Sequence, residues 1–231
     1  MDEITLLEAC EQRVGAEHVE RRLRLEMAHE GRRCARGVDL LHIDRWHAVI
    51  RATLQVAGLY RRARHNTARI QVRHNVIRLA RLPPAFHGFT VLQLSDLHAD
   101  MSGGAMDRLV ELLPDLRYDI CALTGDFRGK TFGPFAAAMD QVARVRERLN
   151  GEVYGILGNH DSIRMVPALE RMGIRMLINE TVALRRDAQH LHLAGIDDAH
   201  FFRTHDLPRV ANAIPAGDCA MLLSHTPEVY R

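Results

Sequence analysis

Lysine is almost absent from this sequence. Of its 31 basic residues only Lys130 is a lysine, a bias that we attribute to genome composition rather than to a need of the protein. The four cysteines, Cys10, Cys34, Cys121 and Cys219, show no C-x-x-C spacing. Two of them fall inside apolar runs that predict strands. We therefore interpret the cysteines as buried free thiols of a protein in a reducing compartment.

Long apolar runs are also missing. No stretch approaches the roughly 18 apolar residues that a membrane span requires, and the acidic N-terminus does not resemble a signal peptide. With 231 residues, 47% of them hydrophobic, the chain can bury one large core, or one core with an appendage. These features predict a cytoplasmic protein, and a peripheral position at the inner face of the cell membrane remains open.

Acidic residues are missing from one long stretch. Residues 45–81 contain nine arginines and no aspartate or glutamate. Residues 1–82 contain 16 basic and 10 acidic residues, whereas the remainder contains 15 and 19. This asymmetry suggests two parts, and Pro83-Pro84 marks the boundary. We predict an N-terminal basic helical segment over 1–82 and a separate domain over 83–231.

The N-terminal segment has three parts. Residues 1–37 are charged and helix-prone, and they fit either a surface helix pair or a partly ordered arm. Residues 38–64 place apolar side chains at helical spacing and end in arginines. This pattern fits a helix on an anionic membrane or, as we favour, a helix packed on the domain with a solvated basic face. No nucleic-acid recognition motif accompanies the charge, so we expect no nucleic-acid partner. Residues 70–82 alternate like an edge strand.

The domain over 83–231 alternates two kinds of pattern, which is typical of an α/β fold. Short apolar runs predict strands, and longer amphipathic stretches predict helices between them. The predicted strands are 89–94, 119–124, 153–157, 190–194 and 219–223, and the predicted helices are 105–117, 134–149 and 164–172.

Polar side chains follow four of the predicted strands at the point where each strand ends. The motifs are Asp96-x-His98, Gly125-Asp126, Gly158-Asn159-His160-Asp161 and, last, His225. Each motif alone is weak, because Gly-Asp is ordinary turn chemistry and a lone histidine is often a core residue. Together they are informative, because ligands of open α/β sheets bind beyond the carboxyl ends of the strands. Oxygen and imidazole ligands without cysteine suit Mn²⁺, Fe or Zn²⁺.

This ordered set of motifs resembles the calcineurin-like metallophosphoesterase superfamily. The resemblance runs from Phe89 to His225 and includes four of the five motifs of that superfamily. The segments 82–88 and 194–198 also resemble a bacterial subgroup of membrane-associated phosphodiesterases, some of which act on nucleotide-linked lipid precursors. The resemblance implies a four-layer αββα sandwich with two mixed sheets and a dinuclear metal centre.

The resemblance also implies a role for each motif residue. Asp96, His98 and Asp126 would hold the first divalent ion, and Asp126, Asn159 and His225 would hold the second. A bridging hydroxide would attack the phosphorus atom. The role assigned to His160 is to contact the phosphoryl oxygen or protonate the leaving group, and the role assigned to Asp161 is to orient the His160 ring.

One motif of the superfamily is missing. No G-H-x-H follows His225, and the sequence ends at Arg231. Either the sequence is truncated at its C-terminus, which we favour, or each ion lacks one ligand. His190-x-His192 is a weaker substitute, and His200 and His205 are candidates for the substrate entrance or ordinary loop residues.

Two functions follow from these observations. We predict a metal-dependent phosphoesterase, more specifically a phosphodiesterase acting on a small-molecule or lipid-linked phosphate ester. The alternative is a catalytically incomplete phosphoesterase-like module that docks on an anionic membrane through residues 38–64.

Overall fold

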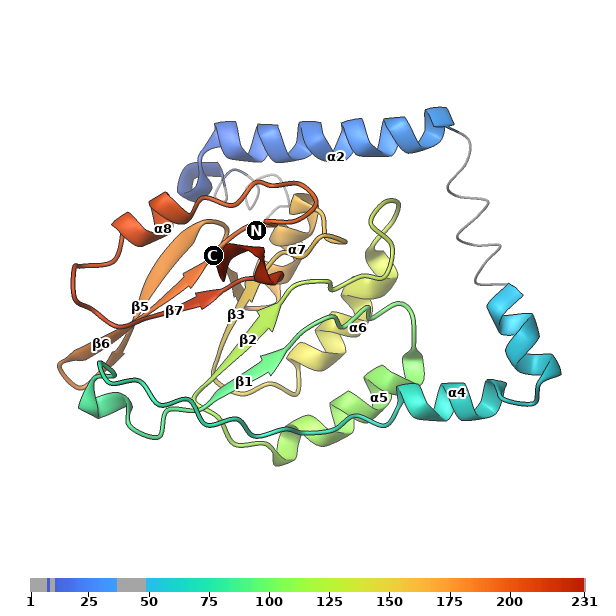
Figure 1. The fold of residues 1–231 in the computed structure, drawn as a ribbon, viewed down its shortest axis with the longest axis horizontal. Coiled ribbons are helices and arrows are strands. Elements are labelled where there is room, and N and C mark those ends of the chain that lie inside the picture. Colours follow the sequence, from blue (N-terminus) through green and yellow to red (C-terminus); the bar gives the residue numbers. More distant parts are fainter. Residues whose placement is uncertain (1–7, 9–10, 37–48, 231) are drawn as a thin grey trace.

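The computed structural model describes residue 8 and residues 11–36 and 49–230. It contains two β-sheets with helices packed against them (Figure 1), so the predicted two-sheet α/β architecture is confirmed. The five predicted strands are all present. Three further elements escaped the sequence patterns: β4 (Ile174–Met176), β5 (Glu180–Arg186) and α8 (Leu207–Asn212).

The first sheet has the order β1-β2-β3-β4, and its other strands are β1 (Val91–Leu94), β2 (Ile120–Thr124) and β3 (Glu152–Ile156). All three pairings between its strands are parallel, so the prediction of two mixed sheets is wrong for this one. The reason is that a helical crossover separates each strand from the next, and such crossovers join parallel strands.

Helices cover one face of this sheet. They are α5 (Gly103–Leu112) with the 3₁₀ turn Leu113–Asp115, α6 (Ala136–Arg146), and α7 (Val166–Arg171) after the 3₁₀ turn Ile163–Met165. Their buried apolar side chains form one core with those of the strands. This packing fixes the strand ends relative to one another, which is what a site built from several strand ends requires.

The second sheet packs against the other face of the first. It has the order β5-β6-β7, with β6 (Gln189–Gly195) antiparallel to β5 and parallel to β7 (Ala220–Leu223). Apolar side chains from both sheets form a second core, in which Ile120 and Ile156 meet Leu191 and Leu193. The sheet-on-sheet packing brings the end of β7 to the same edge as the ends of β1, β2 and β3. Two short 3₁₀ turns, Pro84–Phe86 and Pro227–Tyr230, flank this domain.

The longest helix among the described residues of the N-terminal part is α2 (Ala16–Arg36), which lies across the domain (blue in Figure 1). Val19 and Arg22 on this helix are fully buried. Residues 49–56 are helical, and α4 (Tyr60–Thr67) follows after Gly58, whose φ of 68° breaks the helix. The predicted helix over 38–64 is therefore interrupted, and its residues 38–48 lie outside the described part.

The basic stretch after residue 48 lies on the surface of the domain. No residue of 49–67 is buried, but α4 packs against α5, and Thr67 Oγ1 lies 3.3 Å from Ser102 Oγ. The favoured prediction of a helix on the domain with a solvated basic face therefore agrees with α4. The predicted edge strand over 70–82 is wrong, because these residues form no strand, and Val76 and Ile77 are 86% and 75% exposed. Alternating side chains alone do not make a strand, which also needs backbone pairing.

Two smaller predictions can be checked in the described part of the chain. Cys121 is buried in β2 and Cys219 is half-buried before β7, and both are free thiols, whereas Cys10 and the side chain of Cys34 lie outside it. Burial raises the pKa of Cys121 to about 12, so this thiol is unreactive near neutral pH. None of the described helices has the length and apolar character needed to cross a bilayer.

Candidate metal centre

The predicted ligand motifs all lie at one edge of the two sheets. Asp96 and His98 follow β1, Asp126 follows β2, Asn159 follows β3 and His225 follows β7. Parallel strands end at the same edge, which is why residues far apart in sequence meet here. Three of these residues, Asp96, Asp126 and His225, each offer one ligand atom within 4.8 Å of the others.

Asp126 stands at the middle of the group. Its carboxylate is almost fully buried, and its Oδ2 atom lies 3.4 Å from His225 Nε2, 3.7 Å from His98 Nε2 and 4.0 Å from His160 Nε2. Its Oδ1 atom accepts a hydrogen bond from the His160 amide at 2.9 Å. One oxygen is thus held by the backbone, and the other faces three imidazoles.

The two predicted histidine ligands are oriented from behind. His98 Nδ1 lies 3.0 Å from the carbonyl oxygen of Arg128, and His225 Nδ1 lies 2.8 Å from the carbonyl oxygen of Thr124. An Nδ1–H that donates to a carbonyl fixes the tautomer and leaves the Nε2 lone pair free for a metal ion. Both Nε2 atoms face Asp126.

The donor set fits a cation. With Nδ1–H of His225 donating to Thr124, the neutral ring presents a lone pair on Nε2. That atom lies 3.1 Å from Asn159 Oδ1 and 3.4 Å from Asp126 Oδ2. Three lone-pair atoms without a donor among them repel one another unless a positive charge joins them. Either a proton on Nε2 or a divalent metal ion supplies it, and the nitrogen and oxygen ligands suit Mn²⁺, Fe or Zn²⁺.

The pKa values of Asp126 and His225 are shifted by the interaction between these two side chains. Burial alone would raise the pKa of Asp126, but hydrogen bonds and charge from His225 and His160 hold it below its ordinary value. Burial alone would lower the pKa of His225, but the Asp126 carboxylate raises it to about 9. The Asp126 carboxylate therefore favours a positive charge at this point.

Three of the predicted ligands have an unusual backbone. The φ angles of Asp96, His98 and Asp126 are 53°, 38° and 56°, in a region that costs a non-glycine residue free energy. Main-chain hydrogen bonds between the loops after β1 and β2 hold them there, since Asp96 donates to Gly125 and His98 donates to Asp126 at 3.1 and 3.0 Å. Such strain is characteristic of functional sites.

The glycines of two motifs allow their loops to touch. A Cβ atom on Gly125 would lie 2.5 Å from the Gly158 nitrogen, and a Cβ atom on Gly158 would lie 2.5 Å from the Asp126 nitrogen. Gly125 also has a φ of 86°. The loops after β2 and β3 are thus in backbone contact, and only glycine fits at either position.

Asp161 does not orient the His160 ring, so this prediction from the resemblance is wrong. Its fully buried carboxylate accepts hydrogen bonds from three backbone amides, those of Gly158, Asp126 and Phe127, at 2.9, 2.7 and 2.9 Å. Burial raises its pKa to about 6 although these amides oppose the shift. Asp161 therefore fixes the main chain of two ligand loops.

The surroundings of His160 come from a loop that the sequence patterns did not single out. Its Nδ1 atom lies 3.3 Å from the hydroxyl of Thr131, and its ring packs edge-on against His98 with centroids 5.2 Å apart. The buried side chain of Arg128 donates to the carbonyl oxygens of His160 and Gly133 at 2.7 and 2.8 Å. No spacing or periodicity marks Arg128, because its partners are main-chain atoms.

Comparison with known proteins agrees with this geometry. Residues 89–228 match the sequence model of the family described as Calcineurin-like phosphoesterase. The chain belongs to this family. A curated relative, named as an uncharacterized metallophosphoesterase YkoQ of Bacillus subtilis (strain 168), is 32% identical over 124 residues. That match covers 50% of this chain and 45% of the relative, so the chain spans less than half of its length.

Two of the other histidines that the sequence offered, His190 and His192, lie away from the phosphoesterase centre. His192 pairs with Ala220 at the start of β7, the end opposite His225, and its Nε2 lies 2.9 Å from Asp218. His190 is exposed and lies farther still from that edge. His200 contacts Glu228. The proposed substitution of His190 and His192 for a missing motif is therefore wrong.

Proposed function

We propose that the chain is a metal-dependent hydrolase of phosphate esters, with phosphodiesters as its substrates. The observation that carries the proposal is the convergence of imidazole nitrogens and carboxylate and amide oxygens around Asp126 Oδ2. Membership of the calcineurin-like phosphoesterase family supports the reaction class. Because the chain spans under half of its curated relative, the choice of diesters and of a small-molecule or lipid-linked substrate is part of the proposal.

We infer two ion positions that share Asp126. Asp96, His98 and Asp126 would hold one ion, and Asp126, Asn159 and His225 the other. Support comes from the buried Asp126 carboxylate, whose Oδ2 faces the Nε2 atoms of His98 and His225 from different strand ends. When bound, divalent ions polarise the phosphoryl oxygens and lower the pKa of a water molecule, so that hydroxide is available near neutral pH.

We propose that His160 donates a proton during hydrolysis. Its side chain is 31% exposed, so it can reach a bound substrate, and its Nε2 is 4.0 Å from Asp126 Oδ2. With Thr131 at Nδ1, the Nε2 side of the ring is directed at the centre. Protonated there, it neutralises charge on the phosphoryl oxygen or donates the proton to the leaving oxygen, a role that contributes about 10²- to 10⁴-fold to a rate.

The test separates binding from turnover. The Mn²⁺-, Fe- and Zn²⁺-loaded chain is assayed with bis(p-nitrophenyl) phosphate and p-nitrophenyl phosphate, and bound metal is counted by elemental analysis. We expect Asp126→Asn to lose both metal and hydrolysis. We expect His160→Gln to retain metal and to lose about 10²-fold or more in kcat. Unchanged hydrolysis in both variants would refute the proposal, and faster cleavage of the monoester would refute the diester preference.

A second candidate function rests on the exposed basic stretch. Val49, Ile50 and Val56 are 52%, 52% and 91% exposed on the helical residues 49–56, and α4 beside them carries Arg61, Arg62 and Arg64 with no buried residue. Apolar side chains next to arginines without acidic neighbours suit an anionic membrane surface. We propose a peripheral membrane contact through the described part of residues 38–64.

Vesicle sedimentation tests this contact. The chain is mixed with phosphatidylcholine vesicles, with and without about 30% phosphatidylserine as the anionic lipid. Each mixture is measured at low and at high salt. Binding that needs the anionic lipid and weakens with salt supports the proposal. Failure to bind at low salt excludes it. Vesicle binding without any metal-dependent turnover would instead favour a docking module that has lost catalysis.

A further inference from the structure

Helix α2 buries two charged side chains. Arg22 is fully buried and Glu26 nearly so, although the helix lies outside the 89–228 region that matches the family model. Removing a charge from water costs several kcal/mol unless it is paired and hydrogen-bonded. Apolar side chains would be enough to pack a helix on a domain. The hydrogen-bond partners of Arg22 and Glu26 therefore show which segments these two charges position.

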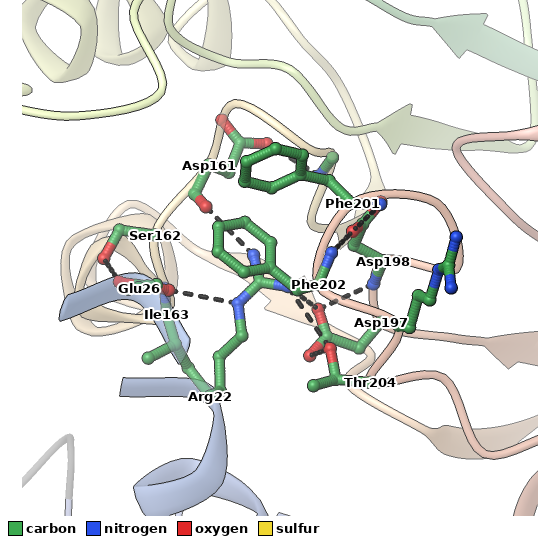
Figure 2. A network of polar contacts seen from close by, with 12 residues as sticks. Arg22, Glu26, Asp161, Ser162, Ile163, Asp197, Asp198, Phe201, Phe202 and Thr204 are labelled. Atoms are coloured by element: carbon green, nitrogen blue, oxygen red, sulfur yellow. Dashed lines mark hydrogen bonds and ion pairs between the residues drawn. The ribbon is translucent and has the colours of Figure 1, made fainter. Parts of the chain in front are cut away.

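Glu26 binds the segment directly after the third ligand motif. Its Oε2 accepts a hydrogen bond from the Ser162 hydroxyl at 2.5 Å, and its Oε1 accepts one from the Ile163 amide at 2.9 Å (Figure 2). Ser162 in turn accepts a bond from the Arg164 amide. One side chain of α2 thus ties down the chain immediately beyond Asp161.

Arg22 links the same segment to a second loop. Its guanidinium donates to Glu26 Oε1 and to the carbonyl oxygen of Asp161, each at 3.0 Å. It also lies 3.3 Å from Asp197 Oδ1 and stacks on the Phe202 ring at 3.6 Å, as Figure 2 shows. Each guanidinium nitrogen has an acceptor and one face carries the Phe202 ring, which explains how the side chain tolerates full burial.

Asp161 connects this network to the metal ligands. Its carbonyl oxygen faces Arg22, while its carboxylate holds the amides of Gly158, Asp126 and Phe127. The path from α2 to the main chain of Asp126 therefore consists of hydrogen bonds to one buried residue. A shift of the Asp161 main chain moves the Asp126 loop and the Gly158 loop together.

The structure assigns to Arg22 and Glu26 the role of positioning residues, which set the affinity of the metal centre by holding the main chain of Asp161–Ile163. This inference rests on the proposed function, since it concerns the same centre. It makes the metal centre depend on α2, a helix that lies outside the region matched by the family model. Losses of outlying partners of metal ligands typically weaken binding about 10- to 100-fold.

The decisive variant replaces both charges with apolar side chains, Arg22→Met with Glu26→Met. Apolar replacement of a buried ion pair often leaves a protein folded, and Asp197 keeps His18 and Thr204 as partners. A purely structural role therefore predicts unchanged metal affinity. The positioning role predicts an Mn²⁺ Kd raised about 10-fold or more. The matched control is Val19→Ala, which removes buried methyl groups from the same helix without touching the network.

Two readouts are taken on the full chain below the melting temperature of each variant. Hydrogen exchange of the metal-free protein follows the peptides that contain Asp126–Phe127 and Gly158–Ile163, and titration followed by electron paramagnetic resonance gives the Mn²⁺ Kd. Faster exchange in both peptides with weaker binding, neither seen in Val19→Ala, supports the assignment. Unchanged exchange, unchanged Kd, or equal changes in the control overturn it.

Single variants keep the test possible if the double variant fails to fold. If the double variant does not fold, Arg22→Lys is measured in its place with the same criteria and an expected smaller rise in Kd, and Glu26→Gln serves as the conservative variant that keeps an acceptor. Glu26→Gln should recover most of the wild-type exchange protection, because an amide oxygen still accepts from Ile163. If the wild type itself binds no metal and hydrolyses nothing, the proposed function fails, and the affinity claim fails with it. The exchange readout still tells whether the two side chains hold the loops.

Discussion

Two arginine-rich helical regions precede the domain, and the structure treats them in opposite ways. Helix α2 buries Arg22 among loops of the metal centre, whereas residues 49–67 have no buried residue. Arginine content alone does not distinguish them. Helix α2 also carries glutamates, including Glu26, which forms part of the shell around Arg22, but 45–81 has no acidic residue. Acidic partners decide whether an arginine can leave water.

The largest expected effect is on the free energy of unfolding when one arginine of each region is replaced. Arg22→Met leaves the buried Glu26 without its cation and leaves Asp197 with His18 and Thr204 only, so we expect a loss of about 3–5 kcal/mol in the free energy of unfolding. Arg62→Met on the exposed helix α4 should change it by less than about 0.5 kcal/mol. Urea unfolding of both variants measures the difference. Equal effects would contradict the contrast between the two regions.

A second prediction concerns Asp197, the buried carboxylate that contacts Arg22 of α2. Burial alone would raise the pKa of Asp197, but Arg22 and His18, both on α2, hold it below its ordinary value, and Thr204 donates to it. An acid whose folded pKa is lowered stabilises the fold above its unfolded pKa of about 3.9, and this contribution is lost as pH falls through the lower folded pKa.

We therefore expect Asp197→Asn to cost about 3 kcal/mol or more at pH 5. The gap between wild type and variant should narrow as the pH falls below about 4. Thermal unfolding from pH 3 to pH 6 measures it. A gap that does not change with pH would mean that charge on Asp197 contributes nothing.

The smallest effect is expected in the exposed region. Val56 is 91% exposed, so Val56→Ser should change the free energy of unfolding by less than about 0.5 kcal/mol. The same variant should weaken binding to anionic vesicles if residues 49–56 contact a membrane. Reduced stability with unchanged vesicle binding would show that this helix packs against the protein instead.

The sequence was sufficient to predict five of the seven described strands and to place the polar residues that follow four of them at one edge of the sheets. Those predictions succeed because parallel strands end at one edge, so order along the chain implies proximity in space. β4 escaped because three residues carry no periodicity, and β5 because its apolar side chains, Val182 and Leu184, are flanked by charge.

The remaining errors have a common physical cause. The side chain of Asp161 could turn toward the neighbouring ring or toward backbone amides, and only the fold decides between them. Likewise the charged pattern of α2 suits a solvated surface, and the burial of Arg22 depends on partners far along the chain, such as Thr204, which is 182 residues away. Residues 70–82 alternate as a strand does, but they form no strand.

The backbone contact between Gly125 and Gly158 has a consequence for how this centre can be altered. No side chain separates the two loops, so nothing between them can yield when one is displaced. Exchanging the ligands themselves, for instance an oxygen donor for a nitrogen donor, leaves this frame intact and is a practical route to a different metal preference. A single added methyl group at either glycine would wedge the frame apart. The centre is thus adaptable in its ligands and fixed in its scaffold.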